Sequence, residues 1–480
     1  MKIALIQPDL DSRHQNQRQA YGSASRPPET GLAVLGSWIK KYASRPHEIT
    51  VLDPGRNLPD LAKQAGEADF LGISDWFSNH DNCVSLAREA KSVNPDLTVV
   101  LGGPNASMIP KEILNNHPYV DYVVSRDGED AFLSLVDGKA KEKVPNLWFR
   151  DGSGKPRFTR QGYTDLTKMP VWDFSDFQNL EKRMEEYLSV QKSGRDVWLV
   201  PPLTIFSSRG CLKAACEGVC EYCTSAEQRV RLLPPEILWR QITHMNRTYD
   251  AEVFYMCDDI FPISPARVKS IAEAKPAGAR ARIRAYGYLP DLAKLSGARL
   301  TEVAKHLEKI GVFNLFFGSE HFDQRVLSRM KKAGVGVEET SRIVKTLHRA
   351  GGIKTTIACL LGLPGESGES LEKNLNAIRF LIGSDIGIER LYISLGMPLK
   401  GTPWYRMLES NPKISREYKQ MTGKNLASDD SPDYMLLSDL SVRHLTSTSR
   451  DEINEYVALM IDFAKKKMPS YRIGGFMLPG

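Results

Sequence analysis

Residues 207–223 read SSRGCLKAACEGVCEYC and hold four of the chain's seven cysteines. Seven is an odd number, so the cysteines cannot all pair with one another within one chain. The chain begins MKIALIQPD, which turns polar too early for a signal peptide and is typical of a buried strand, so we expect a cytoplasmic protein. Because disulfides are rare in that compartment, the clustered cysteines indicate metal ligation, catalysis or simple burial.

The spacing of the cysteines narrows these possibilities. Cys216, Cys220 and Cys223 follow the pattern C-x3-C-x2-C, and Cys211 precedes them. A closed structural zinc site has four ligands with paired CxxC spacing, whereas thiolates also bind iron–sulfur clusters. Three thiolates on a 4Fe–4S cluster would leave one iron open to another ligand. We therefore interpret Cys216, Cys220 and Cys223 as metal ligands, with Cys211 in place of Cys216 as the open alternative.

Length and charge limit the class of protein. The chain has 480 residues, more than one hydrophobic core usually serves, so two or three domains are expected. Its net charge of +6 is a weak bias over such a length and does not indicate a nucleic-acid partner. No run of about 18 apolar residues occurs, so the sequence predicts no membrane span.

The chain alternates apolar strands with amphipathic helices in two regions, which predicts an α/β protein. Residues 1–150 are expected to form a doubly wound, Rossmann-like parallel sheet, with ligands beyond the carboxyl ends of its strands. There Gly102 and Gly103 indicate either close backbone approach to a ligand or a plain turn. Residues 151–198 are typical of a linker, residues 199–405 predict six β/α units of a partial barrel, and residues 406–480 predict a small, mainly helical C-terminal region.

The cysteine run resembles the signature of the radical SAM superfamily, in which C-x3-C-x2-C holds a 4Fe–4S cluster. Tyr222 stands where an aromatic residue is typical of the family. The resemblance implies that S-adenosylmethionine chelates the open iron. It further implies that an external one-electron reductant drives its cleavage to methionine and a 5′-deoxyadenosyl radical, which abstracts a substrate hydrogen. Related enzymes often have the first ligand in "RGC", which is why Cys211 stays an alternative.

Later segments support the same resemblance, which covers residues 203–405. FFGSEHF resembles the strand end that contacts S-adenosylmethionine, and GLPGES resembles the turn near its adenine. The resemblance implies these cofactor-binding residues: Tyr222, Gly318, Ser319, Glu320, Gly362 and Pro364. Lys331 and Lys332 follow an amphipathic helical pattern, and we expect both to be solvated.

Residues 1 to about 135 resemble the cobalamin-binding-type domain that precedes many radical SAM barrels. This implies cobalamin as a third cofactor and methyl transfer to an unactivated carbon or phosphorus centre of a peptide or small natural product. The D-x-H-x-x-G motif of other cobalamin proteins is absent. His80 lacks that context, and we expect a surface or helix-start residue there.

A second function stays open. Radical SAM peptide epimerases resemble this layout, need no cobalamin, and return a hydrogen atom from a cysteine thiol. Cys359, on a predicted strand, is the candidate donor, and Cys257 is a second candidate catalytic residue. Both could instead be buried, small apolar side chains, as free cysteines usually are.

Overall fold

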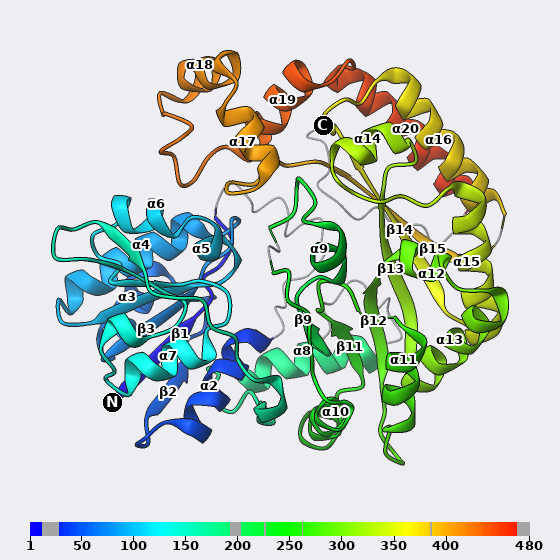
Figure 1. The fold of residues 1–480 in the computed structure, drawn as a ribbon. Coiled ribbons are helices and arrows are strands. Elements are labelled where there is room, and N and C mark those ends of the chain that lie inside the picture. Colours follow the sequence, from blue (N-terminus) through cyan, green and yellow to red (C-terminus); the bar gives the residue numbers. More distant parts are fainter. Residues whose placement is uncertain (12–27, 193–202, 225–226, 262, 385, 468–480) are drawn as a thin grey trace. The chain divides into compact units, whose positions relative to one another are not determined.

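The computed structural model describes residues 1–11, 28–192, 203–224, 227–261, 263–384 and 386–467. The chain forms two compact units (Figure 1). The first comprises Met1–Leu203 together with Ala427–Pro432, and the second comprises Thr204–Leu426 together with Asp433–Gly480. Within the described residues, no helix combines the length and the apolar character that a membrane crossing requires.

A seven-stranded sheet with the order β2-β1-β3-β4-β5-β6-β7 forms the centre of the first unit. Strands β1 to β5 pair in parallel, and β6 and β7 add an antiparallel edge. The strands are β1 (Lys2–Ile6), β2 (Glu48–Val51), β3 (Phe70–Ser74), β4 (Thr98–Gly102), β5 (Tyr122–Val124), β6 (Leu147–Arg150) and β7 (Pro156–Phe158). The order 2-1-3-4-5 is that of a doubly wound fold, as the sequence predicts.

Helices cover both faces of this sheet. They are α2 (Thr30–Tyr42), α3 (Leu58–Gly66), α4 (His80–Val93), α5 (Pro104–Met108), α6 (Pro110–Asn116) and α7 (Glu129–Val136), and a further helix, α8 (Leu180–Lys192), follows them in the first unit. Apolar residues of α3, α4 and α6 share one core with β1, β3 and β4. On the opposite face, Phe132 of α7 lies so close to Gly72 that a Cβ there would be 3.0 Å from its ring. Side-chain burial on two sides thus explains the continuous apolar runs of the central strands.

The second unit contains a six-stranded open sheet with the order β15-β14-β13-β12-β11-β8. Consecutive strands from β11 to β15 pair in parallel. The strands are β8 (Leu203–Ile205), β11 (Val253–Met256), β12 (Arg282–Gly287), β13 (Val312–Glu320), β14 (Lys354–Leu361) and β15 (Ile388–Leu395). A short antiparallel pair, β9 (Ser208–Arg209) and β10 (Arg231–Leu232), follows β8. All six strands predicted from the sequence are present, so the partial barrel is confirmed.

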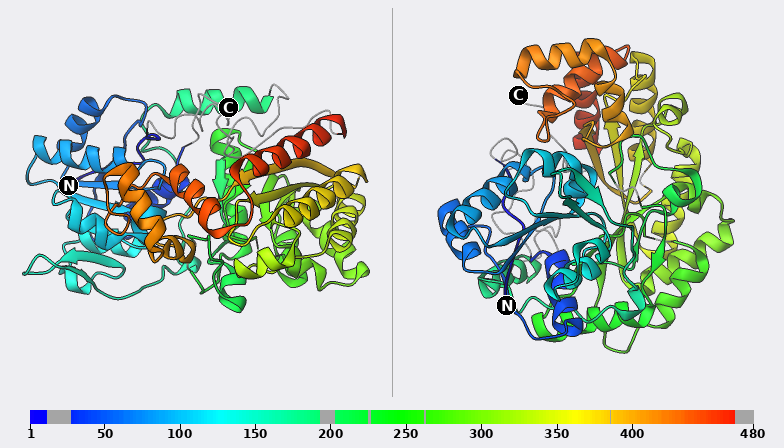
Figure 2. Two further views of the ribbon diagram at one scale, coloured as in Figure 1. Left: turned by 90° about the horizontal axis from the view of Figure 1, so that it is seen from above. Right: turned by 60° about the vertical axis from the view of Figure 1, so that its left-hand side comes forward.

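Helices line one side of this sheet, in green and yellow in Figures 1 and 2. They are α10 (Pro235–Tyr249), α11 (Pro265–Glu273), α12 (Leu289–Ala293), α13 (Gly297–Ile310), α14 (Gln324–Arg329), α15 (Val337–Gly351) and α16 (Gly368–Gly383). Their boundaries follow local chemistry, because Ser264, Ser296 and Ser367 accept hydrogen bonds from the first turns of α11, α13 and α16.

The C-terminal helices complete the second unit. They are α17 (Pro403–Glu409), α18 (Pro412–Thr422), α19 (Tyr434–Leu445) and α20 (Arg450–Lys467), which confirms the mainly helical C-terminal region. The segment between α18 and α19, Ala427–Pro432, belongs to the first unit. The domain boundaries predicted at residues 150, 198 and 405 stay proposals.

Candidate cofactor sites

The cysteine loop starts at a glycine that no other residue could replace without strain. Gly210 has a φ of 90°, and a Cβ on it would lie 2.4 Å from the carbonyl oxygen of Arg229. Cys211 follows as the N-cap of α9 (Leu212–Glu217), and its backbone N–H donates to Glu227 O at 3.2 Å. The glycine of "RGC" therefore lets the chain turn tightly out of β9 and into the loop.

The four thiols of the loop differ in their surroundings. Cys216 is exposed on α9, Cys220 is buried, and Cys211 and Cys223 are partly buried. Burial raises the pKa of Cys211, and the negative charges of Asp259 and Cys220 raise it further.

Buried polar groups anchor the loop to the barrel. Lys213, almost fully buried, donates to Gly218 O at 2.7 Å and also to the backbone oxygen of Lys331. The backbone of Glu221 bonds on both sides: its N–H donates to Met330 O at 3.0 Å, and its oxygen accepts from Trp404 N at 2.8 Å. The loop is therefore held in one position before any cofactor binds, which favours a preformed ligand set.

An ionic cluster lies beside Cys220 and Cys223. The strand register shifts between Gly318 and Glu320, and Glu320 adopts a φ of 60°, rare for a residue with a side chain. Glu320 Oε1 accepts from the Tyr222 hydroxyl at 3.2 Å and lies 3.5 Å from Lys332 Nζ. Burial lowers the pKa of Lys332, but the charges of Glu320 and the two cysteines outweigh it and raise the pKa.

The sequence-based expectation that both lysines are solvated is wrong for Lys332. Its side chain is only 14% exposed, whereas that of Lys331 is 67% exposed and pairs with Glu221. The charge pattern of a helical segment cannot show which of two adjacent lysines is buried and which is exposed. The signal that could have identified Lys332 is its place immediately after α14, where the chain returns to the cysteine loop.

Two neighbours of Glu320 match a ligand-contacting role. Ser319 is nearly buried, and its hydroxyl has no hydrogen-bond partner within the described parts of the chain. A Cβ on Gly318 would lie 2.5 Å from Glu320 Oε1, so glycine leaves room for the ionic cluster. An unpaired buried hydroxyl is costly, and a polar ligand group would satisfy it.

Internal contacts hold the turn GLPGES, which the resemblance places near the adenine of S-adenosylmethionine. Gly362, with a φ of 76°, donates its N–H to the buried Glu366 carboxylate at 2.7 Å, and Pro364 is buried. His321 Nε2 lies 3.3 Å from the other Glu366 oxygen. The side chains of this turn thus close it internally, and a contact of Gly362 or Pro364 with a cofactor stays a proposal.

The two candidate catalytic cysteines lie on opposite faces of the barrel sheet. Cys359 is 1% exposed, pairs with Ile393, and lies near Asn374 of α16, so it packs toward the helices. Burial raises its pKa to about 12. Cys257 has an exposed surface. Desolvation by the surrounding protein nevertheless raises the pKa of its thiol to about 12. Of the two thiols, Cys257 is the one on the accessible face.

Aromatic side chains cover that accessible face. The rings of Tyr255 and Tyr286 are 5.5 Å apart, those of Tyr286 and Phe316 are 4.9 Å apart, and those of Phe316 and Tyr392 are 5.6 Å apart. Tyr286 is 36% exposed. The barrel interior therefore offers an accessible aromatic surface next to Cys257.

Asp258 connects two strand ends beside this surface. Its buried carboxylate accepts hydrogen bonds from the backbone N–H and hydroxyl groups of Ser207 and Ser208, at 2.6 to 3.1 Å. Burial raises its pKa to about 6, because these hydrogen bonds only partly offset desolvation.

The carboxyl edge of the first sheet carries an exposed tryptophan and a tightly packed turn. Trp76 follows β3 and is 42% exposed. Gly103 has a φ of 102°, and a Cβ on it would lie 2.8 Å from the carbonyl oxygen of Asp75. The glycine pair thus serves close approach between two backbone segments of the protein itself, which is the plain-turn alternative.

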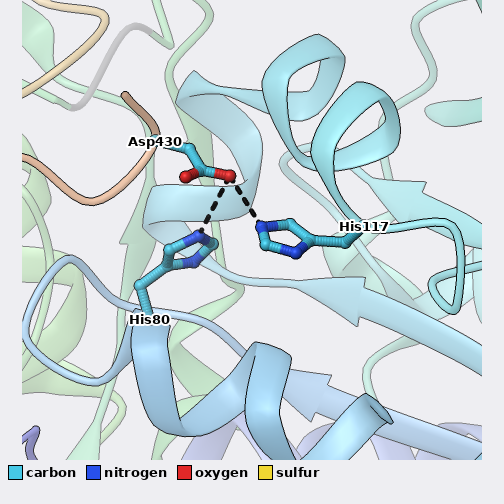
Figure 3. Close-up of side chains that lie close together, drawn as sticks. All are labelled: His80, His117 and Asp430. Carbon is cyan, nitrogen blue, oxygen red and sulfur yellow. Dashed lines mark hydrogen bonds and ion pairs between the residues drawn. The ribbon is translucent and has the colours of Figure 1, made fainter. Parts of the chain in front are cut away.

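His80 is the first residue of α4, as expected, but it is buried rather than on the surface. Its Nδ1 lies 3.0 Å from Asp75 Oδ1, and its Nε2 lies 3.9 Å from Asp430 Oδ2. Figure 3 shows the Asp430 carboxylate between the rings of His80 and His117. Burial lowers the pKa of His80, but Asp75 and Asp430 outweigh it and raise the pKa to about 10. Sequence reasoning missed His117 and Asp430, because nothing local connects residues 313 positions apart.

Two protein families match the chain in separate regions. The B12 binding domain matches residues 28–136, and the radical SAM superfamily matches residues 208–378. The uncharacterized methyltransferase PH0819 of Pyrococcus horikoshii is 23% identical over 441 residues, which cover 88% of this chain and 86% of the relative. Cytidylyl-2-hydroxyethylphosphonate methyltransferase of Streptomyces wedmorensis is 25% identical over 437 residues, covering 78% and 75% of the two chains.

One solved structure shares the fold over most of the chain. The radical S-adenosylmethionine methyltransferase TsrM from Kitasatospora setae, with cobalamin and a [4Fe-4S] cluster bound, matches with a TM-score of 0.64 at 16% identity. The match covers 85% of this chain and 74% of that chain. The family matches confirm both resemblances, in the predicted order. The radical SAM domain implies a 4Fe–4S cluster and S-adenosylmethionine, and the first domain implies cobalamin.

The described residues fit these groups. Soft thiolates beside Lys332 suit an iron–sulfur cluster, and the unpaired Ser319 hydroxyl with Glu320 suits a polar cofactor. Trp76 gives the first unit an exposed apolar surface at the sheet edge where this fold binds ligands. His80 is buried, with Nδ1 on Asp75 and Nε2 facing Asp430.

Proposed function

We propose that this radical SAM enzyme, which carries a B12-binding domain ahead of its barrel, is a cobalamin-dependent methyltransferase. The observation that carries the proposal is the presence of both domain matches in one chain. The names of two relatives that align over three quarters or more of their length, both methyltransferases, support it. When bound, the cluster, S-adenosylmethionine and cobalamin would together supply hydrogen abstraction and a methyl group for transfer.

The proposed cluster ligands are Cys220, Cys223 and one further thiol. The C-x3-C-x2-C spacing supports Cys216, whereas the partly buried position at the start of α9 supports Cys211. We favour Cys211, because it directly follows the turn at Gly210 that the loop uses to leave β9. Cys216 lies farther along α9 and is exposed.

Three side chains near these thiols are proposed to hold S-adenosylmethionine. Glu320 and Ser319 would accept and donate hydrogen bonds to its amino and ribose groups. Lys332 would hold Glu320 in its strained position and balance nearby negative charge, since it lies 3.5 Å from that carboxylate. Tyr222 would fix the second side of the Glu320 carboxylate through its hydroxyl.

The aromatic surface of the barrel supports a small natural product with an apolar or planar part as substrate. Tyr286 and Phe316 offer faces against which such a group would pack. The epimerase alternative has less support. Cys359, its candidate hydrogen donor, packs toward α16, away from this surface.

Cofactor content and product analysis test the proposal together. The chain is purified anaerobically, reconstituted with iron, sulfide and hydroxocobalamin, and quantified for iron and cobalt. With S-adenosylmethionine and a low-potential reductant, we expect both 5′-deoxyadenosine and a cobalamin-dependent yield of S-adenosylhomocysteine. Four irons without cobalt, and 5′-deoxyadenosine without S-adenosylhomocysteine, would contradict methyl transfer and favour the epimerase.

A further inference from the structure

The first unit contains a histidine–carboxylate cluster that the cofactor chemistry does not use. Its members are His80, His117 and Asp430. Each offers one ligand atom, and these atoms lie within 4.8 Å of one another. Within the described residues, this is the one group of three or more histidine, cysteine or acidic side chains that meets this distance.

The three residues come from separate parts of the first unit. His80 begins α4, His117 follows the last residue of α6, and Asp430 belongs to Ala427–Pro432. Asp430 Oδ2 lies 2.7 Å from His117 Nε2 and 3.9 Å from His80 Nε2. The side chains of His80 and Asp430 are 2% and 13% exposed, and that of His117 is 15% exposed. Both imidazoles therefore direct Nε2 at one carboxylate oxygen in a mostly dry site (Figure 3).

An unpaired atom points into the centre of the cluster. His80 Nε2 is buried and has no hydrogen-bond partner within the described residues. Buried ring nitrogens are normally satisfied, so the structure lacks a partner at this position. A metal ion that displaces the ring proton and accepts the lone pair of Nε2 would supply it.

The Nδ1 atoms of both rings are hydrogen-bonded to neighbouring side chains, as the second nitrogen of a metal-bound histidine usually is. His80 Nδ1 bonds to Asp75 at 3.0 Å, and Asp75 is fixed in turn by Asn105 Nδ2 at 3.1 Å. His117 Nδ1 bonds to the Tyr119 hydroxyl at 2.7 Å. A carboxylate or other oxygen on the far nitrogen orients a ligating imidazole and increases its basicity. The carboxylates of Asp75, which is buried, and of Asp430, which is partly buried, also give the cluster a negative charge that a cation would neutralise.

We propose that His80, His117 and Asp430 bind a zinc ion, with water as the fourth ligand. Two imidazole nitrogens and one carboxylate favour zinc over magnesium or calcium, which prefer all-oxygen sites. Tetrahedral ligands of zinc lie about 3.4 Å apart for bonds of about 2.05 Å. The observed separations of 2.7 and 3.9 Å need adjustments of well under an ångström on either side. The ion would tie Ala427–Pro432 to α4 and α6.

Zinc titration of the reconstituted protein tests this site. The cluster is loaded first, so that the cysteines are occupied, and bound zinc is measured by competition with a chromophoric chelator. The variants are Asp430→Asn and His117→Gln, and the matched control is His444→Gln, which removes an imidazole from another histidine–carboxylate contact. We expect one zinc per chain in the unaltered protein and the control, and at least 100-fold weaker binding in both variants.

A milder variant covers the case in which the ligand substitutions unfold the unit. Tyr119→Phe keeps all three ligands and removes only the hydrogen bond to His117, and we expect roughly 10-fold weaker zinc binding. X-ray absorption at the zinc edge should show nitrogen and oxygen neighbours near 2.0–2.2 Å. Equal zinc binding in all proteins, or sulfur neighbours at about 2.3 Å, would overturn the proposal.

Discussion

The cysteine loop and the histidine cluster are two candidate metal sites built in opposite ways. Every thiol of the loop lies within residues 211–223, whereas His117 and Asp430 are 313 residues apart. The loop is recognisable because its ligand spacing is written in adjacent residues. The cluster exists only after α4, α6 and Ala427–Pro432 have come together. A site made by one loop can thus be identified from its sequence, and a site made by the fold cannot.

Removal of single thiols from the cysteine loop gives the largest expected effect. It tests whether the ligands of a site made by one loop can be identified from the sequence. Cys220→Ala and Cys211→Ala should lose the 4Fe–4S cluster completely, because three thiolates are the minimum set. The matched control, Cys216→Ala, should keep the iron content and the low-temperature electron paramagnetic resonance signal of the reduced cluster. If Cys216→Ala loses the cluster and Cys211→Ala keeps it, the spacing alone identifies the ligands, and burial is a misleading guide.

The buried carboxylate of Asp258 extends the comparison to contacts between residues at intermediate separation in the sequence. Asp258 bonds to Ser207 and Ser208, some 50 residues earlier, and its pKa is about 6 instead of 3.8. The folded state therefore binds a proton more tightly than the unfolded state does. Stability should fall as pH rises from about 4 to 7, by up to about 3 kcal/mol at about 1.4 kcal/mol per pKa unit.

Asp258→Asn isolates this contribution, because the amide does not titrate. Denaturant unfolding at several pH values measures the free energy of unfolding of both proteins. As pH rises, the unaltered protein should lose stability relative to the variant. A difference that is constant with pH would mean that the four hydrogen bonds offset desolvation fully and that Asp258 is ionised throughout.

The strands of the barrel and the cysteine loop were predictable because each is a contiguous segment. Tyr222, Ser319 and Glu320 were inferred from the resemblance of such segments to a family, and their contact with a cofactor stays a proposal. The left-handed turn at Gly210 and the bulge at Glu320 lie in the same segments. Lys332 was misjudged, because its burial depends on Glu320, which lies on another element. The strands of both sheets followed from apolar periodicity, but the strand order and the face on which Cys359 lies required the observed pairing.

Lys332 gives the next largest expected effect. Lys332→Met removes the cation 3.5 Å from Glu320 and should weaken S-adenosylmethionine binding by about 10-fold to 100-fold, as loss of a charge-assisted contact does. Lys305→Met on α13 is the control, since Lys305 is exposed. Equilibrium dialysis with labelled S-adenosylmethionine measures both variants after cluster loading. Equal affinities would remove Lys332 from the site and restore the solvated role expected from sequence.

The smallest expected effect is a change in the free energy of unfolding. It distinguishes Cys359 from Cys257, which the sequence analysis named together as candidate catalytic residues. Cys359→Ala empties a packed position between β14 and α16 and should lower the free energy of unfolding by about 1 kcal/mol. Cys257→Ala removes an exposed thiol and should change stability by less than about 0.5 kcal/mol. Neither variant should alter the slow cleavage of S-adenosylmethionine without substrate, measured as 5′-deoxyadenosine. If Cys359→Ala changes that rate at unaltered stability, its thiol reaches the reacting groups, and the parity of β14 no longer argues against the epimerase.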